Sequence, residues 1–297
     1  MDFFGILIGI ICEGLIYSIV SFGVYITYKI LDFPDMTVDG SFPLGMSLTA
    51  MLSIMGVNPI LTLIISFMFG AVAGILTGLI HVKLKVGDLL SGIIMMIALY
   101  SINLRIAGRP NLPFFDKVTL FRNDILANIF GEGSRVYATV AILIILTIFM
   151  KILLDTFLST KRGYLLRSVG DNETLVTSLA IDKGNIKIMG LAIANGIVAF
   201  AGSIYAHDRS FFEISAGTGT LVIAVSNVII GMQIMNRVKF LKPTTAVIFG
   251  SLLYRAIISM AISFGLEARD LKLITAVLLL VILILNKMSL VSKVAKK

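Results

Sequence analysis

The chain has 297 residues, of which 58% are hydrophobic and only 14% charged, and its mean hydropathy is +1.00. A soluble domain could not keep so much apolar surface from water, so this composition excludes a water-soluble protein and predicts one embedded in a membrane. The net charge of +8 comes mostly from Lys and Arg in loops and at the C-terminus, which indicates topology and contact with anionic lipid and argues against a nucleic-acid partner.

Long apolar segments separated by short charged loops fill nearly the whole chain. Because roughly 20 apolar residues in a helix span the hydrocarbon core, the predicted fold is all-α, a polytopic transmembrane helix bundle in one domain, 1–297. About nine spans are expected, near 3–29, 41–56, 60–82, 88–104, 136–158, 186–206, 218–236, 244–264 and 270–287. The second and fourth are short enough to be broken or half-crossing helices.

The first polar turn, from Lys29 to Ser41, contains the carboxylates Asp32, Asp35 and Asp39. Their spacing is not that of an EF-hand loop, so no metal site is predicted. Two interpretations stay open. The turn is a solvated connection with helix caps, or it breaks the helix beside the translocation path, where a cavity satisfies the exposed backbone.

Small residues recur at helical spacing in two spans. Gly70, Gly74 and Gly78 form a doubled small-xxx-small motif, and Gly196 lies on a second small face that runs from Ala192 to Ser203. Without Cβ bulk, neighbouring helices approach closely, so helix packing is the expected role and substrate contact the alternative.

Two distant stretches of the chain resemble each other. The stretch Gly70–Ile97 resembles Gly250–Leu279, since each is an apolar helix followed by a charged turn and a restart at Asp-Leu. These are spans three to four and eight to nine, an odd offset, which predicts an inverted repeat with halves near 1–135 and 159–297. The alternative is that any two apolar hairpins look somewhat alike. Lys and Arg favour one side by about two to one, which predicts N-out and C-in.

The longest polar segment, 159–187, is expected on the cytoplasmic side. Asp171 or Asn172 could cap a helix that begins there, and Gly184 could end it. Leu175 and Leu179, four residues apart, would give that short helix an apolar face. The helix either lies on lipid headgroups or docks onto a partner protein.

Two asparagines lie within predicted spans. Asn195 and Asn227 either line the translocation path or join helices through hydrogen bonds. Glu13 and Arg255, also within spans, could pair with each other or lie at protein contacts.

Two stretches resemble one family. Gly163–Gly202, with Gly163, Arg167, Asp171, Ala180-Ile181 and Ala199 to Gly202 at matching positions, resembles the cytoplasmic loop and following helix of the branched-chain amino acid permease family, the membrane subunits of ABC importers. Gly14–Phe42 is similar to that family's opening. The resemblance implies that Asp171 to Ile181 forms a coupling helix that docks an ATPase. The ATPase-coupling residues it implies are Gly163, Arg167, Asp171, Asn172, Glu173, Leu175, Leu179 and Ile181.

By this resemblance the chain is a permease subunit of the cytoplasmic membrane that imports a small organic solute. An amino acid is expected, and an aromatic one is among the candidates. The chain has no G-x-x-x-x-G-K-[ST] phosphate loop, so it is expected to be no enzyme and to hold no cofactor; ATP and Mg²⁺ would be bound by the partner ATPase. The other implied partners are an extracellular solute-binding lipoprotein, a second copy or a homologous permease, and membrane lipid. The alternative is a stand-alone ion-coupled secondary transporter in which Glu13 or Asp39 is essential.

Overall fold

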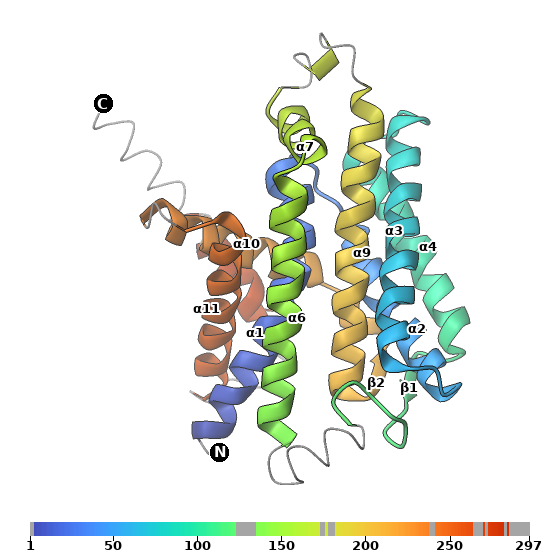
Figure 1. Ribbon diagram of the computed structural model, residues 1–297, viewed down its shortest axis with the longest axis vertical. Coiled ribbons are helices and arrows are strands. Elements are labelled where there is room, and N and C mark those ends of the chain that lie inside the picture. Colours follow the sequence, from blue (N-terminus) through green and yellow to red (C-terminus); the bar gives the residue numbers. More distant parts are fainter. Residues whose placement is uncertain are drawn as a thin grey trace.

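The computed structural model describes residues 3–122, 135–172, 176–177, 182–237, 241–263, 270, 273–281 and 284. Long helices run side by side and form almost all of this part (Figure 1). The helices are α1 (Phe3–Val24), η1 (Tyr25–Ile30), α2 (Val38–Ile54), α3 (Pro59–Val82), α4 (Asp88–Ala107), α6 (Arg135–Leu158), α7 (Lys161–Asp171), α9 (Lys183–Arg209), η3 (Ile214–Gly217), α10 (Thr220–Arg237) and α11 (Pro243–Ser263). Two short strands, β1 (Asn111–Pro113) and β2 (Phe211–Glu213), pair antiparallel.

Seven helices of the described part are long and apolar enough to cross a membrane. They coincide with seven of the nine expected spans, so the all-α polytopic bundle is confirmed. The expected span 41–56 corresponds to α2, which has 17 residues and is shorter than a full crossing. The expected span 270–287 falls largely outside the described residues, and the count of nine stays a prediction.

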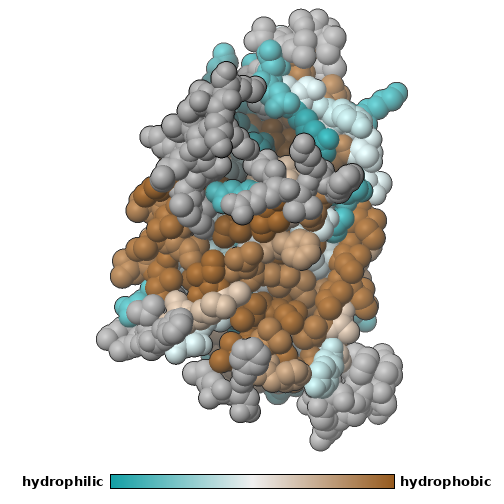
Figure 2. All heavy atoms as spheres, turned by 90° about the vertical axis from the view of Figure 1, so that its left-hand side faces the viewer, coloured by the Kyte–Doolittle hydropathy of each residue, from teal (hydrophilic) through white to brown (hydrophobic). Residues whose placement is uncertain are grey.

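The surface agrees with a membrane position. Hydrophobic residues form a broad belt across the middle of the molecule, and hydrophilic residues gather at its upper end (Figure 2). Large apolar side chains of the long helices, such as Ile145, Leu61 and Ile97, are half or more exposed. Such a surface is stable only against lipid or another apolar protein face.

Helix α9 packs against α1, α2 and α3, and it is buried along most of its length. Helix α3 packs antiparallel to it, and α2 packs parallel to it. The contacts are close because they are made of glycine: a Cβ on Gly45 would come 1.8 Å from the Ala199 carbonyl oxygen, and one on Gly74 would come 2.1 Å from the Leu191 carbonyl oxygen. Neither position has room for a larger residue.

The glycines predicted to pack helices lie at this contact. Cβ atoms on Gly70 and Gly78 would come within 3 Å of α9, and Gly196 lies against the ring and carbonyl of Phe67. Gly74 makes the closest approach of the doubled motif. The structure therefore places the whole motif against α9.

The first helix does not end as an α-helix. Its last segment, η1, is a π-helix, and the chain then leaves the helix at Asp32, which has a positive φ of 51°. Pro34 follows and has no N–H to continue the ladder. Residues 31–37 therefore form a non-helical break between η1 and α2. Both interpretations of this turn expect such a break, and its place beside a translocation path stays a prediction.

The segment 159–187 differs from the prediction. Thr160 accepts a hydrogen bond from the Gly163 N–H and starts α7, so Asp171 is the last residue of a helix and does not cap one. Gly184 does not end a helix either, because Asp182 caps the start of α9 through the Gly184 and Asn185 N–H groups. The sequence did not predict α7 or its cap at Thr160, because the composition of this helix is polar. Asn172 is the C-cap of α7, and the short helix predicted to begin at Asp171 or Asn172 lies largely outside the described residues.

Candidate functional site

The non-helical break 31–37 brings one carboxylate into the interior of the bundle. Asp35 is fully buried, and it accepts hydrogen bonds from the Thr37 N–H at 2.9 Å and from Asn195 Nδ2 at 2.7 Å. Asn195 in turn accepts a hydrogen bond from Ser41 Oγ at 2.7 Å. Because Asn195 lies near the middle of α9, this network lies at mid-depth of the bundle. In the described part of the chain no ion pair reaches Asp35.

Asp39, one helical turn further on, has a different partner. Its two carboxylate oxygens accept hydrogen bonds from the Gly219 N–H at 2.9 Å and the Leu221 N–H at 2.8 Å. These groups belong to the N-terminus of α10, whose free N–H groups and dipole favour a negative charge. Asp39 thus caps α10 from α2, and the first turns of both helices meet at this carboxylate.

The segment before α10 allows the first turns of α2 and α10 to approach each other at Asp39. Pro43 lies inside α2 and cannot donate to the Asp39 carbonyl, which therefore stays free of its usual partner in the helix. Gly217 lies against that carbonyl, and a Cβ there would come 2.1 Å from the oxygen. Only glycine allows the segment 210–219 to approach α2 so closely.

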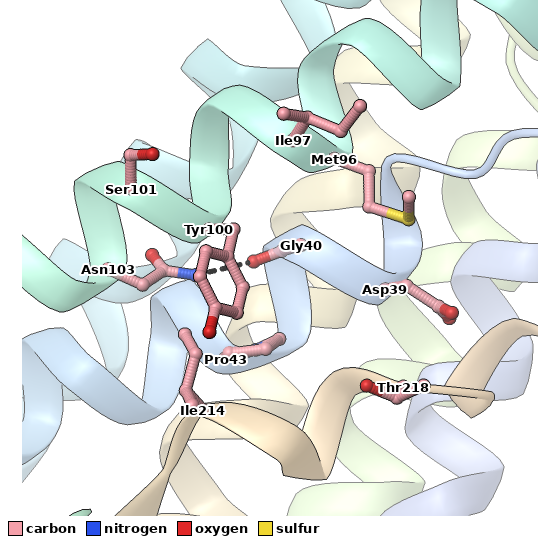
Figure 3. A pocket seen from close by; sticks show the side chains of 10 residues that line it. All are labelled: Asp39, Gly40, Pro43, Met96, Ile97, Tyr100, Ser101, Asn103, Ile214 and Thr218. Carbon is pink, nitrogen blue, oxygen red and sulfur yellow. Dashed lines mark hydrogen bonds between the residues drawn. The ribbon is translucent and has the colours of Figure 1, made fainter. Parts of the chain in front are cut away.

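A cavity of about 330 Å³ opens beside Asp39 (Figure 3). Helices α2 and α4 and the segment 214–218 enclose it. Tyr100 stands over it from α4, and Asn103 donates from Nδ2 to the Gly40 carbonyl at 3.1 Å. The remaining lining residues are Pro43, Met96, Ile97, Ser101, Ile214 and Thr218. The cavity is mostly apolar with a few polar groups, which is typical of small-molecule sites.

The other residues predicted for the path lie elsewhere. Asp32 is exposed at the start of the break. Asn227 is buried and donates to Ser21 Oγ at 2.9 Å and Ser251 Oγ at 3.3 Å, so it joins α10 to α1 and α11. Asp35 and Asn195 meet, Asp39 lies beside the cavity, and Asp32 and Asn227 join neither group.

The predicted coupling residues divide into described and undescribed ones. Gly163 is buried in α7 against Leu158, Arg167 is exposed, and Asp171 and Asn172 end the helix. Arg167 lines a cavity of about 220 Å³ together with Asp155 and Lys242, at the end of the bundle where α7 lies. Glu173, Leu175, Leu179 and Ile181 lie outside the described residues.

Helix α7 touches the chain directly before the break. A Cβ on Gly170 would come 1.7 Å from the Ile30 carbonyl oxygen and 3.2 Å from the Leu31 Cα. Gly190 of α9 lies against the same Leu31 and against Leu166 of α7. The predicted coupling segment is therefore in direct contact with the end of η1.

One cluster of charges was only partly foreseen. Glu13 pairs with Arg255 at 2.8 Å, the pairing considered from the sequence, and also with Arg209. The Arg255 guanidinium lies 4.0 Å from the centre of the Tyr17 ring. The cluster joins α1, α9 and α11. The only signal for Arg209 was its place at the end of a long apolar span.

The comparisons with known proteins agree with this geometry. The family described as "Branched-chain amino acid transport system / permease component" matches residues 6–285. The chain is 44% identical over 277 residues to "Tyrosine transport system permease protein" of Clostridioides difficile (strain R20291), which covers 93% of this chain and 90% of that protein. It is 29% identical over 280 residues, 93% of this chain and 96% of the other, to "Uncharacterized protein RP368" of Rickettsia prowazekii (strain Madrid E). No solved structure matches significantly.

A polytopic helix bundle with an interrupted helix and a cavity beside it is typical of membrane transport proteins. The chain belongs to the branched-chain amino acid permease family, and the resemblance seen in Gly14–Phe42 and Gly163–Gly202 is confirmed. It is a multi-pass permease of the cell membrane.

Proposed function

We propose that this chain is the membrane-spanning subunit of an ATP-driven amino-acid importer. It works as a dimer with a second copy or a homologous permease, with cytoplasmic ATPase subunits that bind ATP and Mg²⁺, and with an extracellular solute-binding protein. The observation that carries the proposal is the 44% identity, over nearly the full length of both chains, to a protein described as a tyrosine transport system permease. That relative also suggests an aromatic amino acid as substrate.

The translocation path runs past Asp39. A charge facing hydrocarbon costs about 2.5–3.5 kcal/mol on insertion scales, so a half-buried carboxylate at mid-depth faces water or protein. The two helix N-termini that meet at Asp39 resemble the discontinuous helices with which transporters surround their substrates at the midplane. Tyr100 and Ile97, half or more exposed beside this cavity, then face the path or the second copy.

The ATPase acts through α7 and the segment that follows it. The coupling residues, Gly163 to Ile181, dock the ATPase, and α7 presses on Ile30 and Leu31 through Gly170. Movement of α7 is therefore passed to η1, then to the break, and from there to Asp35 and Asp39. The ATPase drives this movement because it binds the two states of the permease with different affinity.

The proposed orientation is N-out and C-in, with two inverted halves and about nine spans. Several observations support it. α1 begins at the end of the bundle opposite to α7 (Figure 1). Asp32 ends the first helix of one half and Ser210 ends α9, each with a positive φ near 50°. Three residues after each of these helix ends lies a carboxylate, Asp35 or Glu213. Each carboxylate accepts a hydrogen bond from the residue two positions further along the chain. α3 is antiparallel to α9 just as α11 is antiparallel to α1.

The test is reconstitution. The tagged permease is purified with the proteins that accompany it, and uptake of labelled L-tyrosine into proteoliposomes is measured with and without ATP. We expect uptake only with ATP and the accompanying ATPase. Leu175→Ala with Leu179→Ala should abolish most of this uptake and leave the permease folded, as judged by its elution in size-exclusion chromatography. Uptake by the permease alone, driven by a proton or sodium gradient, would contradict the proposal.

The structure gives the ion-coupled alternative little support. Glu13, one of the carboxylates it requires, is neutralised by Arg209 and Arg255. Asp39, the other, accepts two backbone N–H groups. An ion-coupled carrier needs a carboxylate that exchanges its partner with an ion during each cycle, and both of these carboxylates are bound to groups of the protein.

A further inference from the structure

A second cavity, of about 280 Å³, lies at the end of the bundle where β1 and β2 pair. It is separate from the cavity beside Asp39, since the described residues that line the two cavities are all different. On the proposed orientation it opens to the outside. Its main lining residues are Met46, Phe115, Tyr205, Arg209, Phe211 and Glu213. Its size is near the lower end for ligand sites, which indicates a small ligand.

Among the described residues that line this cavity, one is a cation, Arg209, and its contacts hold it in place. Arg209 pairs with Glu13 through Nη2, its Nε lies 3.6 Å from Asp208, and its guanidinium lies 5.6 Å from the centre of the Tyr205 ring. A guanidinium has five N–H donors in a planar fork, and these contacts use two nitrogens. The remaining donors are available for a carboxylate in the cavity, the partner that this fork matches best.

Within the same described lining, one residue is an anion, Glu213. Glu213, at the end of β2, is exposed and accepts a hydrogen bond from Ser215 Oγ. One neutral hydroxyl leaves the carboxylate with free acceptor positions, and no ion pair within the described residues compensates its charge. The cavity thus offers a cation to a carboxylate and an anion to an ammonium group.

The rest of the wall is aromatic. Phe115 and Phe211 are stacked at 6.3 Å with an angle of 8° between their planes, and Tyr205 faces the same cavity from α9. Phe115 remains 58% exposed despite this stacking. Exposed ring faces at a site edge favour a planar aromatic ligand, which gains contacts with each of them.

We propose that this cavity is an outward-facing subsite for a zwitterionic aromatic amino acid, in which Arg209 binds the carboxylate, Glu213 binds the ammonium group and the rings of Phe115, Phe211 and Tyr205 hold the side chain. This proposal rests on the proposed function. One positive and one negative group on the wall match a ligand that has both charges and no net charge. An amine or a carboxylic acid with the same ring would contact only one of the two wall charges.

The experiment uses the purified permease in lipid nanodiscs, without ATP, ATPase or binding protein. Cys12, the single cysteine, is replaced by serine, and Ala216→Cys places a thiol on the cavity wall. The rate of labelling by a charged, water-soluble maleimide is measured with increasing L-tyrosine. At a concentration of about ten times Kd, mass action predicts roughly tenfold slower labelling.

Ligand analogues and one variant test the two charges. Tyramine, which lacks the carboxylate, and 3-(4-hydroxyphenyl)propionate, which lacks the ammonium group, should each protect the thiol less than L-tyrosine. Glu213→Gln should raise the Kd for L-tyrosine roughly tenfold and leave that for the propionate unchanged, because only the ammonium contact is lost. Asp116→Asn is the matched control, since it removes an equal charge from a carboxylate that is 79% exposed and pairs with Lys117 outside the cavity. It should change neither Kd.

The proposal is overturned if L-tyrosine does not slow the labelling, if L-alanine protects equally well, or if Glu213→Gln and Asp116→Asn behave alike. Absence of labelling at Ala216→Cys would overturn it too, because it would show that the cavity is closed to water. Each of these results leaves ATP-driven uptake in proteoliposomes untouched. Failure of the subsite and failure of the proposed function are therefore separate outcomes.

Discussion

The two breaks in the bundle, 31–37 before α2 and 210–219 before α10, have similar plans and very different surroundings. Each follows a helix that ends at a residue with positive φ, Asp32 or Ser210, and each carries a carboxylate three residues later. Asp35 in the first break is fully buried and accepts two N–H groups. Glu213 in the second is exposed and accepts one hydroxyl.

Burial therefore separates a break that is fixed in the interior from one that is exposed at the surface. A buried carboxylate without hydrogen bonds is very costly, so the partners of Asp35 must stay in place for the bundle to be stable. An exposed carboxylate has no such requirement. The first break can then pass on a movement of α7, and the second is available for recognition at the other end of the bundle.

The largest expected effect comes from separating α2, the helix that follows the first break, from α9. Gly45→Ala puts a Cβ 1.8 Å from the Ala199 carbonyl oxygen, so the two helices must move apart. We expect a loss of about 3 kcal/mol or more and little folded protein. The measurement is the yield of monodisperse permease in size-exclusion chromatography after detergent extraction. Gly9→Ala, in α1 with no atom within 4 Å, is the control and should be extracted like the unmodified protein. A normal yield of Gly45→Ala would show that α2 is not fixed to α9.

A matched pair of substitutions tests the carboxylates themselves. Asp35→Asn replaces one of the two accepting oxygens by an NH2 group, which is a donor. This donor faces an N–H group, so a buried N–H loses its acceptor at a cost of about 1–3 kcal/mol in stability. Glu213→Gln keeps its bond to Ser215 and should change the stability by less than about 0.5 kcal/mol. The measurement is the melting temperature of each variant in the same detergent, compared with that of the unmodified permease. Equal shifts for both variants would show that the two breaks do not differ as described.

The smallest of the three effects concerns the contact of Asp39 in α2 with the N-terminus of α10, the helices that follow the two breaks. Asp39→Ala removes the cap of α10, which should cost about 0.5–2 kcal/mol, and Asp39→Asn should cost less because its amide oxygen still accepts one N–H. The free energy is obtained from thermal unfolding of the three proteins. If Asp39→Ala is as stable as the unmodified permease, the α10 N-terminus does not depend on α2. ATP-driven uptake by the same variants then measures how far Asp39 serves the path.

The sequence by itself determined the membrane class, the positions of seven spanning helices and the glycines at the helix contacts. Hydrophobic length and small-residue spacing are local properties, since each helix satisfies its own backbone in lipid. The family also followed from two short stretches. The helix α7 was missed because its composition is polar, and capping by Thr160 becomes visible only with the Gly163 N–H in place.

Only the tertiary structure decided which polar groups meet. Asp35 and Asn195 are 160 residues apart, Asp39 and Leu221 are 182 apart, and Glu13 meets Arg209 from 196 residues away. In lipid a polar group gains most by finding another polar group, and many pairings among α1, α2, α9, α10 and α11 would satisfy that requirement equally. The close glycine contacts fix the register of the helices, and the register selects one pairing from the many.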